Sequence, residues 1–198
     1  MIDDGLPDGS RCATGHRACQ KAPVLCQSTD RDPREPRMIP DALLADAEAL
    51  LAACRTNGIM LATAESCTGG LIAATLTAIA GSSDVVDRGF VAYSNEAKNE
   101  MIGVPIDLIH AHGAVSEEVA RAMAEGALAR SRATIAVSVT GMAGPGGGSA
   151  EKPVGLVCFG LAKKATPVTS ERHVLPGDRT GIRAAIVARA FSMIRTCI

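Results

Sequence analysis

A serine followed closely by two glycines lies between two apolar runs of the chain. Ser66 belongs to the segment Ala64-Glu65-Ser66-Cys67-Thr68-Gly69-Gly70, which separates a strand-like run from a helix-like run. A nucleophile on such a turn is exposed above the sheet edge, and the backbone N–H groups of the turn lie at the positive end of the helix dipole. An oxyanion formed beside Ser66 would be stabilised there. The same turn could equally bind a phosphate without any chemistry, and both interpretations stay open.

A tyrosine and a lysine mark the next strand-to-helix junction. It reads Tyr93-Ser94-Asn95-Glu96-Ala97-Lys98, with Tyr93 expected at the end of a strand and Lys98 in the first turns of a helix. The positive end of a helix disfavours an ammonium, and desolvation lowers the pKa of a lysine further. A neutral Lys98 could accept the proton of a serine hydroxyl, while Tyr93 could relay that proton or hold the amine. The alternative is a solvated surface lysine beside a core tyrosine.

A glycine-rich segment follows a third apolar run. It reads Thr140-Gly141-Met142-Ala143-Gly144-Pro145-Gly146-Gly147-Gly148-Ser149 and offers backbone N–H groups that can bind a phosphate or an oxyanion. It is not a Walker loop, because no Gly-Lys-Ser/Thr follows, and it is not a dinucleotide-binding fingerprint, because it leads into a strand. The alternative is a mobile surface loop.

Other candidate residues carry weaker signals. Cys67 could act as a nucleophile, but a small thiol facing the core is the expected role. His110 and His112 have no carboxylate or thiol at metal-ligand spacing, so we expect no metal site. Arg179 and Arg183 could bind a phosphate of a substrate, although charged residues of a terminal helix are usually only solvated.

The composition indicates one globular domain without the features of a nucleic-acid or membrane binder. The 198 residues are 47% apolar, and the mean hydropathy is +0.18. The chain has no Trp, three Phe and one Tyr, so it offers few aromatic platforms on which bases could stack. Its net charge of −1 provides no basic field that would attract nucleic acid or an anionic membrane.

The cysteines are typical of a cytoplasmic protein with reduced thiols, and we expect that location. Those near the amino terminus have a regular spacing that matches no zinc pattern: Cys12, Cys19 and Cys26. The others are scattered in apolar surroundings: Cys54, Cys67, Cys158 and Cys197. No apolar run reaches the ~18 residues that a membrane helix needs, and the amino terminus lacks the pattern of a secretory signal.

Periodic patterns divide the chain into an extension and a globular domain. Residues 1–37 are rich in Asp, Arg, Pro and Gly, and we interpret them as a flexible extension of a domain that spans residues 38–198. Within that domain helices and strands alternate. The predicted helices begin near Asp41, Leu71, Asn95, Pro105, Ser116 and Asp178, and the predicted strands cover residues 59–64, 88–93, 133–139, 154–162 and 168–175.

This alternation predicts an α/β fold, a three-layer α/β/α sandwich around a mixed, mostly parallel sheet. The strands over residues 154–162 and 168–175 form a pair at a sheet edge in this interpretation. The turn at Ser66, the junction before Lys98 and the loop after Gly141 all follow strands. Ligands bind at the carboxyl edge of open α/β sheets, so we expect the three segments to converge there.

Five motifs together resemble the CinA C-terminal-domain family, over roughly residues 39–197. Because they are long and occur in the family's order, they are far more specific together than any one alone. In chain order they are Ala64-Glu65-Ser66-Cys67-Thr68-Gly69-Gly70, Gly81-Ser82-Ser83, Gly89-Phe90-Val91-Ala92-Tyr93-Ser94-Asn95-Glu96-Ala97-Lys98, His112-Gly113-Ala114-Val115-Ser116 and Thr140-Gly141-Met142-Ala143-Gly144-Pro145-Gly146-Gly147.

The resemblance implies a nicotinamide-nucleotide amidase, which hydrolyses nicotinamide mononucleotide to nicotinic acid mononucleotide and ammonia in pyridine-nucleotide recycling. It also implies a serine–lysine mechanism without a metal ion or cofactor. Ser66 matches the nucleophile, Lys98 the base and Tyr93 the assisting hydroxyl. Thr140 matches the oxyanion position opposite the serine. The resemblance further implies a homodimer.

A nucleotide substrate is expected to contact all three segments. The expected substrate-binding residues are Thr68, Gly69, Gly70, Asn95, Gly141, Gly144, Gly146 and Gly147. Two alternatives stay open: a nucleotide-binding regulatory module without turnover, and an amidase for a different amide. The joint presence of Ser66, Tyr93 and Lys98 argues against a module that only binds, because binding needs no nucleophile and base.

Overall fold

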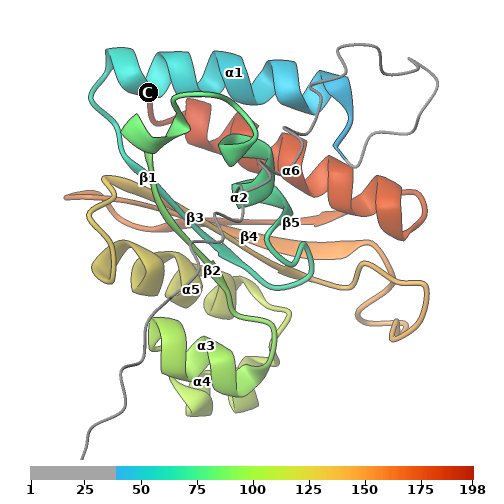
Figure 1. Cartoon of the computed structure of the whole chain (residues 1–198). Helices are drawn as coiled ribbons and strands as arrows, with labels where there is room; N and C mark the ends of the chain where they lie inside the picture. Colours follow the sequence, from blue (N-terminus) through green and yellow to red (C-terminus); the bar gives the residue numbers. More distant parts are fainter. Residues whose placement is uncertain (1–38) are drawn as a thin grey trace, which may run out of the picture. The chain divides into compact units, whose positions relative to one another are not determined.

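The computed structural model describes residues 39–198, and the predicted extension over residues 1–37 lies outside them. In the described chain, helices and strands alternate at first, three consecutive helices and three consecutive strands follow, and the chain ends in a long helix (Figure 1). The elements are α1 (Asp41–Thr56), β1 (Leu61–Glu65), α2 (Leu71–Thr77), a 3-10 turn (Ser82–Asp84), β2 (Val86–Val91), α3 (Asn95–Ile102), α4 (Ile106–His112), α5 (Glu117–Ala129), β3 (Ile135–Gly141), β4 (Leu156–Lys163), β5 (Thr169–Val174) and α6 (Arg179–Arg195).

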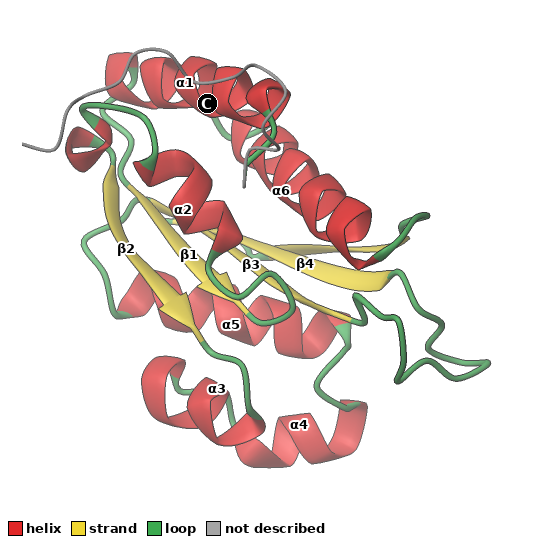
Figure 2. Cartoon of the chain, turned by 45° about the vertical axis from the view of Figure 1, so that its right-hand side comes forward, coloured by secondary structure: helices red, strands yellow, loops and turns green. Residues whose placement is uncertain are grey.

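The five strands form one mixed sheet in the order β2-β1-β3-β4-β5 (Figure 2). β1 pairs in parallel with β2 and with β3, whereas β4 runs antiparallel to β3 and to β5. The predicted α/β fold is therefore confirmed. Because β4 alone is reversed, four of the five strands share one direction, although half of the pairings are antiparallel.

The sheet lies between two helical layers, with α1, α2 and α6 on one face and α3, α4 and α5 on the other (Figure 1). Alternation along β3 divides its side chains between the two layers. Ile135, Val137 and Val139 join the core beneath α1 and α6. Ala136 joins the core of the opposite layer, where a Cβ on Gly160 would lie 2.3 Å from the Ala120 carbonyl oxygen. Small residues on this face thus let α5 approach the sheet closely.

Local signals placed the helices correctly. Along α1, the buried residues follow the predicted 3.6-residue period: Leu43, Ala47, Leu50, Leu51 and Cys54. The side chains of Ser94, Ser116 and Asp178 cap α3, α5 and α6 by accepting main-chain N–H bonds. None of the helices within residues 39–198 is both long and apolar enough to cross a membrane.

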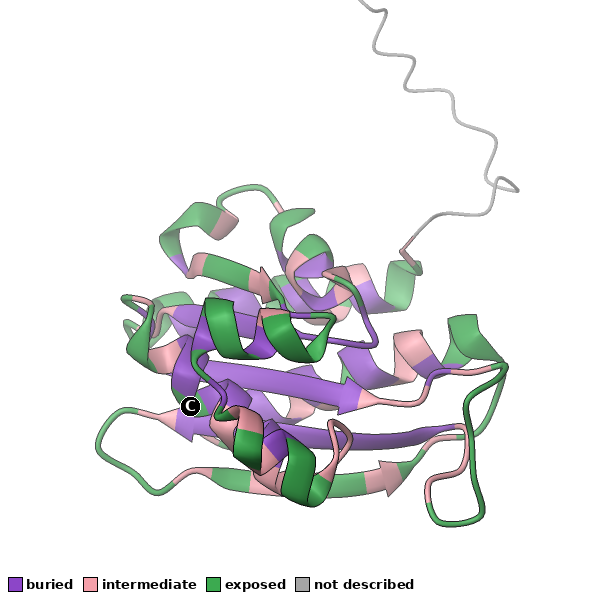
Figure 3. Ribbon diagram, turned by 90° about the horizontal axis from the view of Figure 1, so that it is seen from below, coloured by how far each residue is buried: buried purple, intermediate pink, exposed green. Residues whose placement is uncertain are grey.

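Two strands are displaced by two residues from their predicted ranges, because pairing sets their ends. β2 is Val86–Val91 since its residues pair with Leu61 through Glu65 of β1. β3 reaches Gly141 because its pairing with β4 continues to the pair of Gly141 and Val157. The central strands β1, β3 and β4 are buried along most of their length, whereas no residue of the edge strands β2 and β5 is fully buried (Figure 3).

Candidate active site

Ser66 lies on the tight turn between β1 and α2, at the carboxyl edge of the parallel strands. Its main-chain N–H donates to the Val139 carbonyl at 3.0 Å, and its carbonyl accepts from Gly69 at 3.1 Å. Gly69 and Gly70 have φ angles of +60° and +92°, which side-chain-bearing residues rarely adopt, so the turn needs both glycines. Ser66 remains 9% exposed, the most of any residue in β1 or the turn up to Thr68. Its hydroxyl is therefore held at a fixed place at the sheet edge.

Lys98 is almost completely buried and its amine contacts Ser66. The side chain is on the fourth residue of α3 and is 1% exposed. Its Nζ lies 3.2 Å from Ser66 Oγ, 3.2 Å from the Ala92 carbonyl oxygen and 3.1 Å from the Tyr93 carbonyl oxygen. The predicted convergence of the first two segments is thus present, and the predicted alternative of a solvated surface lysine is wrong.

Burial makes the ammonium form of Lys98 less stable than it is in water. Burial lowers the pKa of Lys98, although the nearby Cys67 and Glu96 act in the opposite direction. The direction agrees with the one predicted from the sequence. Of the two predicted causes, the positive helix end and desolvation, desolvation is the one that lowers the pKa here. A neutral amine has two hydrogens and one lone pair. The carbonyls of Ala92 and Tyr93 can accept the two hydrogens, which leaves the lone pair for the hydroxyl hydrogen of Ser66.

Tyr93 contacts the lysine through its backbone rather than through its side chain. Its carbonyl oxygen accepts from Lys98 Nζ, whereas the residue is 62% exposed. The predicted alternative of a core tyrosine is therefore wrong, and the assisting role of its hydroxyl stays a prediction. Asn95, the first residue of α3, is also exposed.

Thr140 is buried at the end of β3, and its hydroxyl already has a partner. Oγ1 donates to the Ala114 carbonyl at 2.8 Å, so an oxyanion could receive this hydrogen only after rotation of the hydroxyl. The N–H of Ser66 is also occupied by Val139. In the described part of the chain, the N–H groups of Cys67 and Thr68 donate to no main-chain carbonyl. These two groups of the turn remain as donors for an oxyanion, and the role of Thr140 stays a prediction.

The start of α6 connects the serine turn with the glycine-rich loop. Arg179 donates to the Gly144 carbonyl at 2.7 Å, and Arg183 donates to the Thr68 carbonyl at 2.6 Å. Both arginines, which the sequence suggests as solvated or phosphate-binding residues, thus hold the backbone of the site. Among the buried side-chain atoms of residues 39–198, Thr68 Oγ1 and Arg183 Nε lack a hydrogen-bond partner.

The other predicted binding residues are distributed along the two loops. Gly141 is the last residue of β3, and Gly144 is half-buried beneath Arg179. Gly146 and Gly147 are exposed. Cys67 is buried in the core as predicted, and burial raises the pKa of its thiol to about 11. The Ser66 hydroxyl, not this thiol, is the group hydrogen-bonded to Lys98 Nζ, which favours Ser66 as the nucleophile.

Sequence reasoning did not single out Glu65, which is fully buried beside the nucleophile. Its carboxylate accepts hydrogen bonds from the main-chain N–H groups of Ile72 and Ala73. A signal was available, because Glu65, directly before Ser66, is the one charged residue in the strand that leads to the turn.

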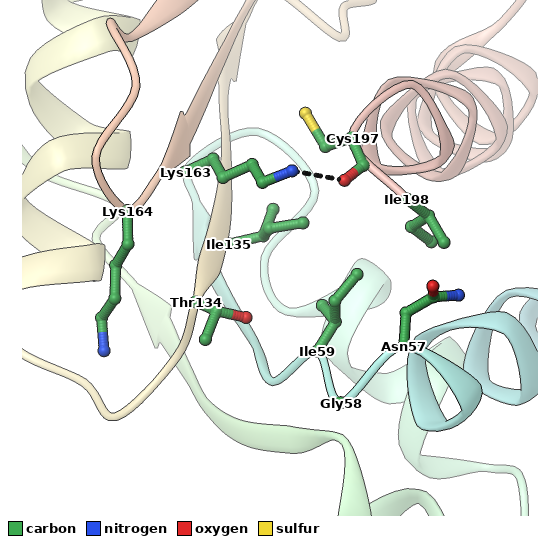
Figure 4. A pocket seen from close by; sticks show the side chains of 9 residues that line it. All are labelled: Asn57, Gly58, Ile59, Thr134, Ile135, Lys163, Lys164, Cys197 and Ile198. Carbon is green, nitrogen blue, oxygen red and sulfur yellow. Dashed lines mark hydrogen bonds between the residues drawn. The ribbon is translucent and has the colours of Figure 1, made fainter.

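A hollow of about 290 Å³ lies at the end of the sheet opposite to Ser66, where β1 and β3 begin (Figure 4). It is next to the first residue of β3 and the last residue of β4, where Lys163 donates to the Cys197 carbonyl at 2.8 Å. Ser66 follows the opposite end of the sheet, so this hollow is not part of the candidate site. Within residues 39–198, no three His, Cys, Asp or Glu side chains form a group that could hold a metal ion.

The fold and the site define an α/β protein with a buried serine–lysine pair at the carboxyl edge of its sheet. The profile of the CinA C-terminal domain family matches residues 44–198. The chain belongs to this family.

Curated relatives support the same assignment. A CinA-like protein of Mycolicibacterium gilvum is 48% identical over 175 residues, and one of Mycolicibacterium paratuberculosis is 54% identical over 142 residues. These matches cover 88% and 70% of the chain, but only 40% and 33% of the relatives. The chain thus spans well under half the length of these relatives.

Solved structures of similar length share the fold. The competence/damage inducible protein CihA from Agrobacterium tumefaciens is 49% identical, with a TM-score of 0.78 over 81% of this chain and 98% of that one. A CinA superfamily protein from Escherichia coli is 30% identical, with a TM-score of 0.75 over 82% of this chain and 95% of that one. The described domain therefore corresponds to nearly the whole of each of these structures.

Proposed function

We propose that this domain is an amidase that hydrolyses the carboxamide of nicotinamide mononucleotide to give nicotinic acid mononucleotide and ammonia. The observation that carries the proposal is the buried amine of Lys98 at 3.2 Å from Ser66 Oγ. A lysine that is desolvated and surrounded by carbonyls is suited to accept a proton rather than to bind an anion. A module that only binds nucleotides needs no such pair.

The reaction begins with proton transfer from Ser66 Oγ to neutral Lys98 Nζ as the oxygen attacks the carboxamide carbon. The resulting oxyanion would accept hydrogen bonds from the N–H groups of Cys67 and Thr68, which donate to no main-chain carbonyl. When the C–N bond breaks, the Lys98 ammonium returns its proton to the leaving nitrogen, which departs as ammonia. An ester between Ser66 and the nicotinoyl group remains.

Water completes the cycle. Lys98, neutral again, takes a proton from the water that attacks the ester carbon. Collapse of the second tetrahedral intermediate breaks the ester bond, and the proton passes from Lys98 to Ser66 Oγ. The products are the nicotinic acid nucleotide and the free enzyme. No step requires a metal ion, so we expect chelators to leave the rate unchanged.

The substrate and its cellular setting are part of the proposal. The glycine-rich loop and the start of α6 would hold the ribose and phosphate of the nucleotide, and a second copy of the chain would complete a homodimer. The cysteines of residues 39–198 are free, and three of the four are buried, which supports a reducing, cytoplasmic location.

Ammonia release tests the proposal. The full chain is incubated separately with nicotinamide mononucleotide, free nicotinamide and the full dinucleotide, with Ser66→Ala as the matched control. We expect release from the mononucleotide only, and none from the control. Release from a different amide would support an amidase activity but would refute nicotinamide mononucleotide as its substrate. Tight nucleotide binding without release from any amide would favour the regulatory module.

A further inference from the structure

The carboxylate of Glu65 crosses the nucleophile turn and binds the helix beyond it. Glu65 is the last residue of β1, and it is fully buried. Its Oε2 accepts from the Ile72 N–H at 3.0 Å, and its Oε1 accepts from the Ala73 N–H at 2.9 Å. Oε1 also accepts from Thr63 Oγ1 at 3.2 Å. The carboxylate therefore joins the end of β1 to the start of α2.

This contact replaces a conventional helix cap. Gly70, the residue before α2, provides no side-chain hydrogen bond to the helix. The first N–H groups of a helix lack partners inside the helix, and a negative charge is favourable there. A buried carboxylate is otherwise costly unless its hydrogen bonds are satisfied. Three donors satisfy that of Glu65, so helix and carboxylate stabilise each other.

The turn that carries Ser66 is consequently attached by hydrogen bonds to β3 on one side and to α2 on the other. The N–H of Ser66 binds the Val139 carbonyl of β3, and the Glu65 carboxylate binds α2 on the far side of the turn. We propose that Glu65 is a positioning residue that holds Ser66 Oγ within hydrogen-bond distance of Lys98 Nζ. This inference rests on the proposed serine–lysine reaction.

Glu65→Gln tests the inference in the full chain. Glutamine keeps the size, but its amide group offers one acceptor oxygen and turns two hydrogens toward a main-chain donor. A misplacement of about 1 Å at a reacting centre can cost about 10²-fold in rate. We therefore expect kcat for ammonia release to fall about 10- to 100-fold, with KM changed less than threefold. The pH at which the rate rises should stay unchanged, because Glu65 does not contact the lysine.

Asp87→Asn is the matched control for a purely structural effect. The Asp87 side chain is only 2% exposed, and it also accepts a main-chain N–H, that of Arg132 at 3.0 Å. Asp87 lies near the start of β2, whereas Ser66 follows the opposite end of the neighbouring strand. We expect Asp87→Asn to lower Tm and leave kcat within twofold of the wild type.

The outcomes separate the inference from its alternatives. A Glu65→Gln enzyme that loses Tm but keeps wild-type kcat would show that Glu65 only caps α2, and the inference would be overturned. If Glu65→Gln fails to fold, Thr63→Val removes one donor to the same carboxylate. A severalfold loss of kcat in that variant supports the inference, and an unchanged kcat overturns it.

A crystallographic comparison applies even if the wild type releases no ammonia. That result would refute the proposed function but not the geometry. In crystals of wild type and Glu65→Gln, or Thr63→Val, the distance between Ser66 Oγ and Lys98 Nζ should lengthen beyond hydrogen-bond range in the variant. An unchanged distance would overturn the inference independently of any substrate.

Discussion

Replacing Lys98 by arginine tests the proposed base directly. Lys98 is 1% exposed and burial lowers its pKa, so the amine can be neutral and accept the proton of Ser66. A guanidinium remains protonated and has no acceptor. General-base catalysis contributes about 10²- to 10⁴-fold to a rate, so Lys98→Arg should lower kcat about 10³-fold. This corresponds to about 4 kcal/mol of transition-state stabilisation.

Lys98→Met distinguishes the loss of the basic amine from the loss of side-chain packing. Methionine fills much of the same space without a charge, and this variant should be as inactive as Lys98→Arg. It should also have a higher Tm at neutral pH. The pKa of Lys98 is lower in the folded protein than in the unfolded chain, so protonation of Lys98 destabilises the fold. This destabilisation is complete at pH values below the folded-state pKa, and it disappears as the pH rises through the ordinary lysine pKa. The gain in Tm should therefore shrink toward high pH.

The pH dependence of ammonia release completes the assay. For the wild type, kcat/KM should rise with pH through the lowered pKa of Lys98 and level off below the ordinary lysine value. A Lys98→Arg enzyme within tenfold of wild-type kcat would refute the base. A rate that keeps rising up to the ordinary lysine pKa would refute the depressed pKa but not the base. A rate that does not depend on pH at all would refute Lys98 as the titrating base, and Lys98 would then only position the serine.

Three further predictions concern stability and the extension. Deletion of residues 1–37 should leave kcat and Tm nearly unchanged, because that segment lacks the apolar periodicity of a core element; a loss of many degrees in Tm would contradict this. Gly126→Ala places a Cβ 1.9 Å from the Ile102 carbonyl oxygen. It should destabilise the fold by about 1–3 kcal/mol in urea unfolding, and an unchanged midpoint would argue against the close packing of α3 on α5. The Arg132 N–H, together with nearby guanidinium groups, lowers the pKa of Asp87 to about 2. Its stabilising effect is present above the ordinary aspartate pKa and lost as pH falls through about 2, so the Tm difference between wild type and Asp87→Asn should narrow from neutral to acid pH. A constant difference would contradict that origin.

The helices could be predicted because their signals are local. The 3.6-residue period of α1 and the capping serines before α3 and α5 act within a few residues of the chain. The ends of β2 and β3 could not be predicted, since they depend on registers with β1 and β4. Strand pairing joins segments distant in sequence, so no local pattern contains it.

For the candidate site, too, some features follow from the local sequence and others only from the tertiary structure. The sequence by itself determined which segments are candidates for the site: the serine turn, the junction before Lys98 and the glycine-rich loop. Only the tertiary structure decided that Lys98 is buried against Ser66, 32 residues away, and that Tyr93 faces solvent. It also decided that Glu65 binds α2. Residue types and turn geometry are properties of the local chain, whereas burial and hydrogen-bond partners depend on which distant strands and helices the sheet brings together.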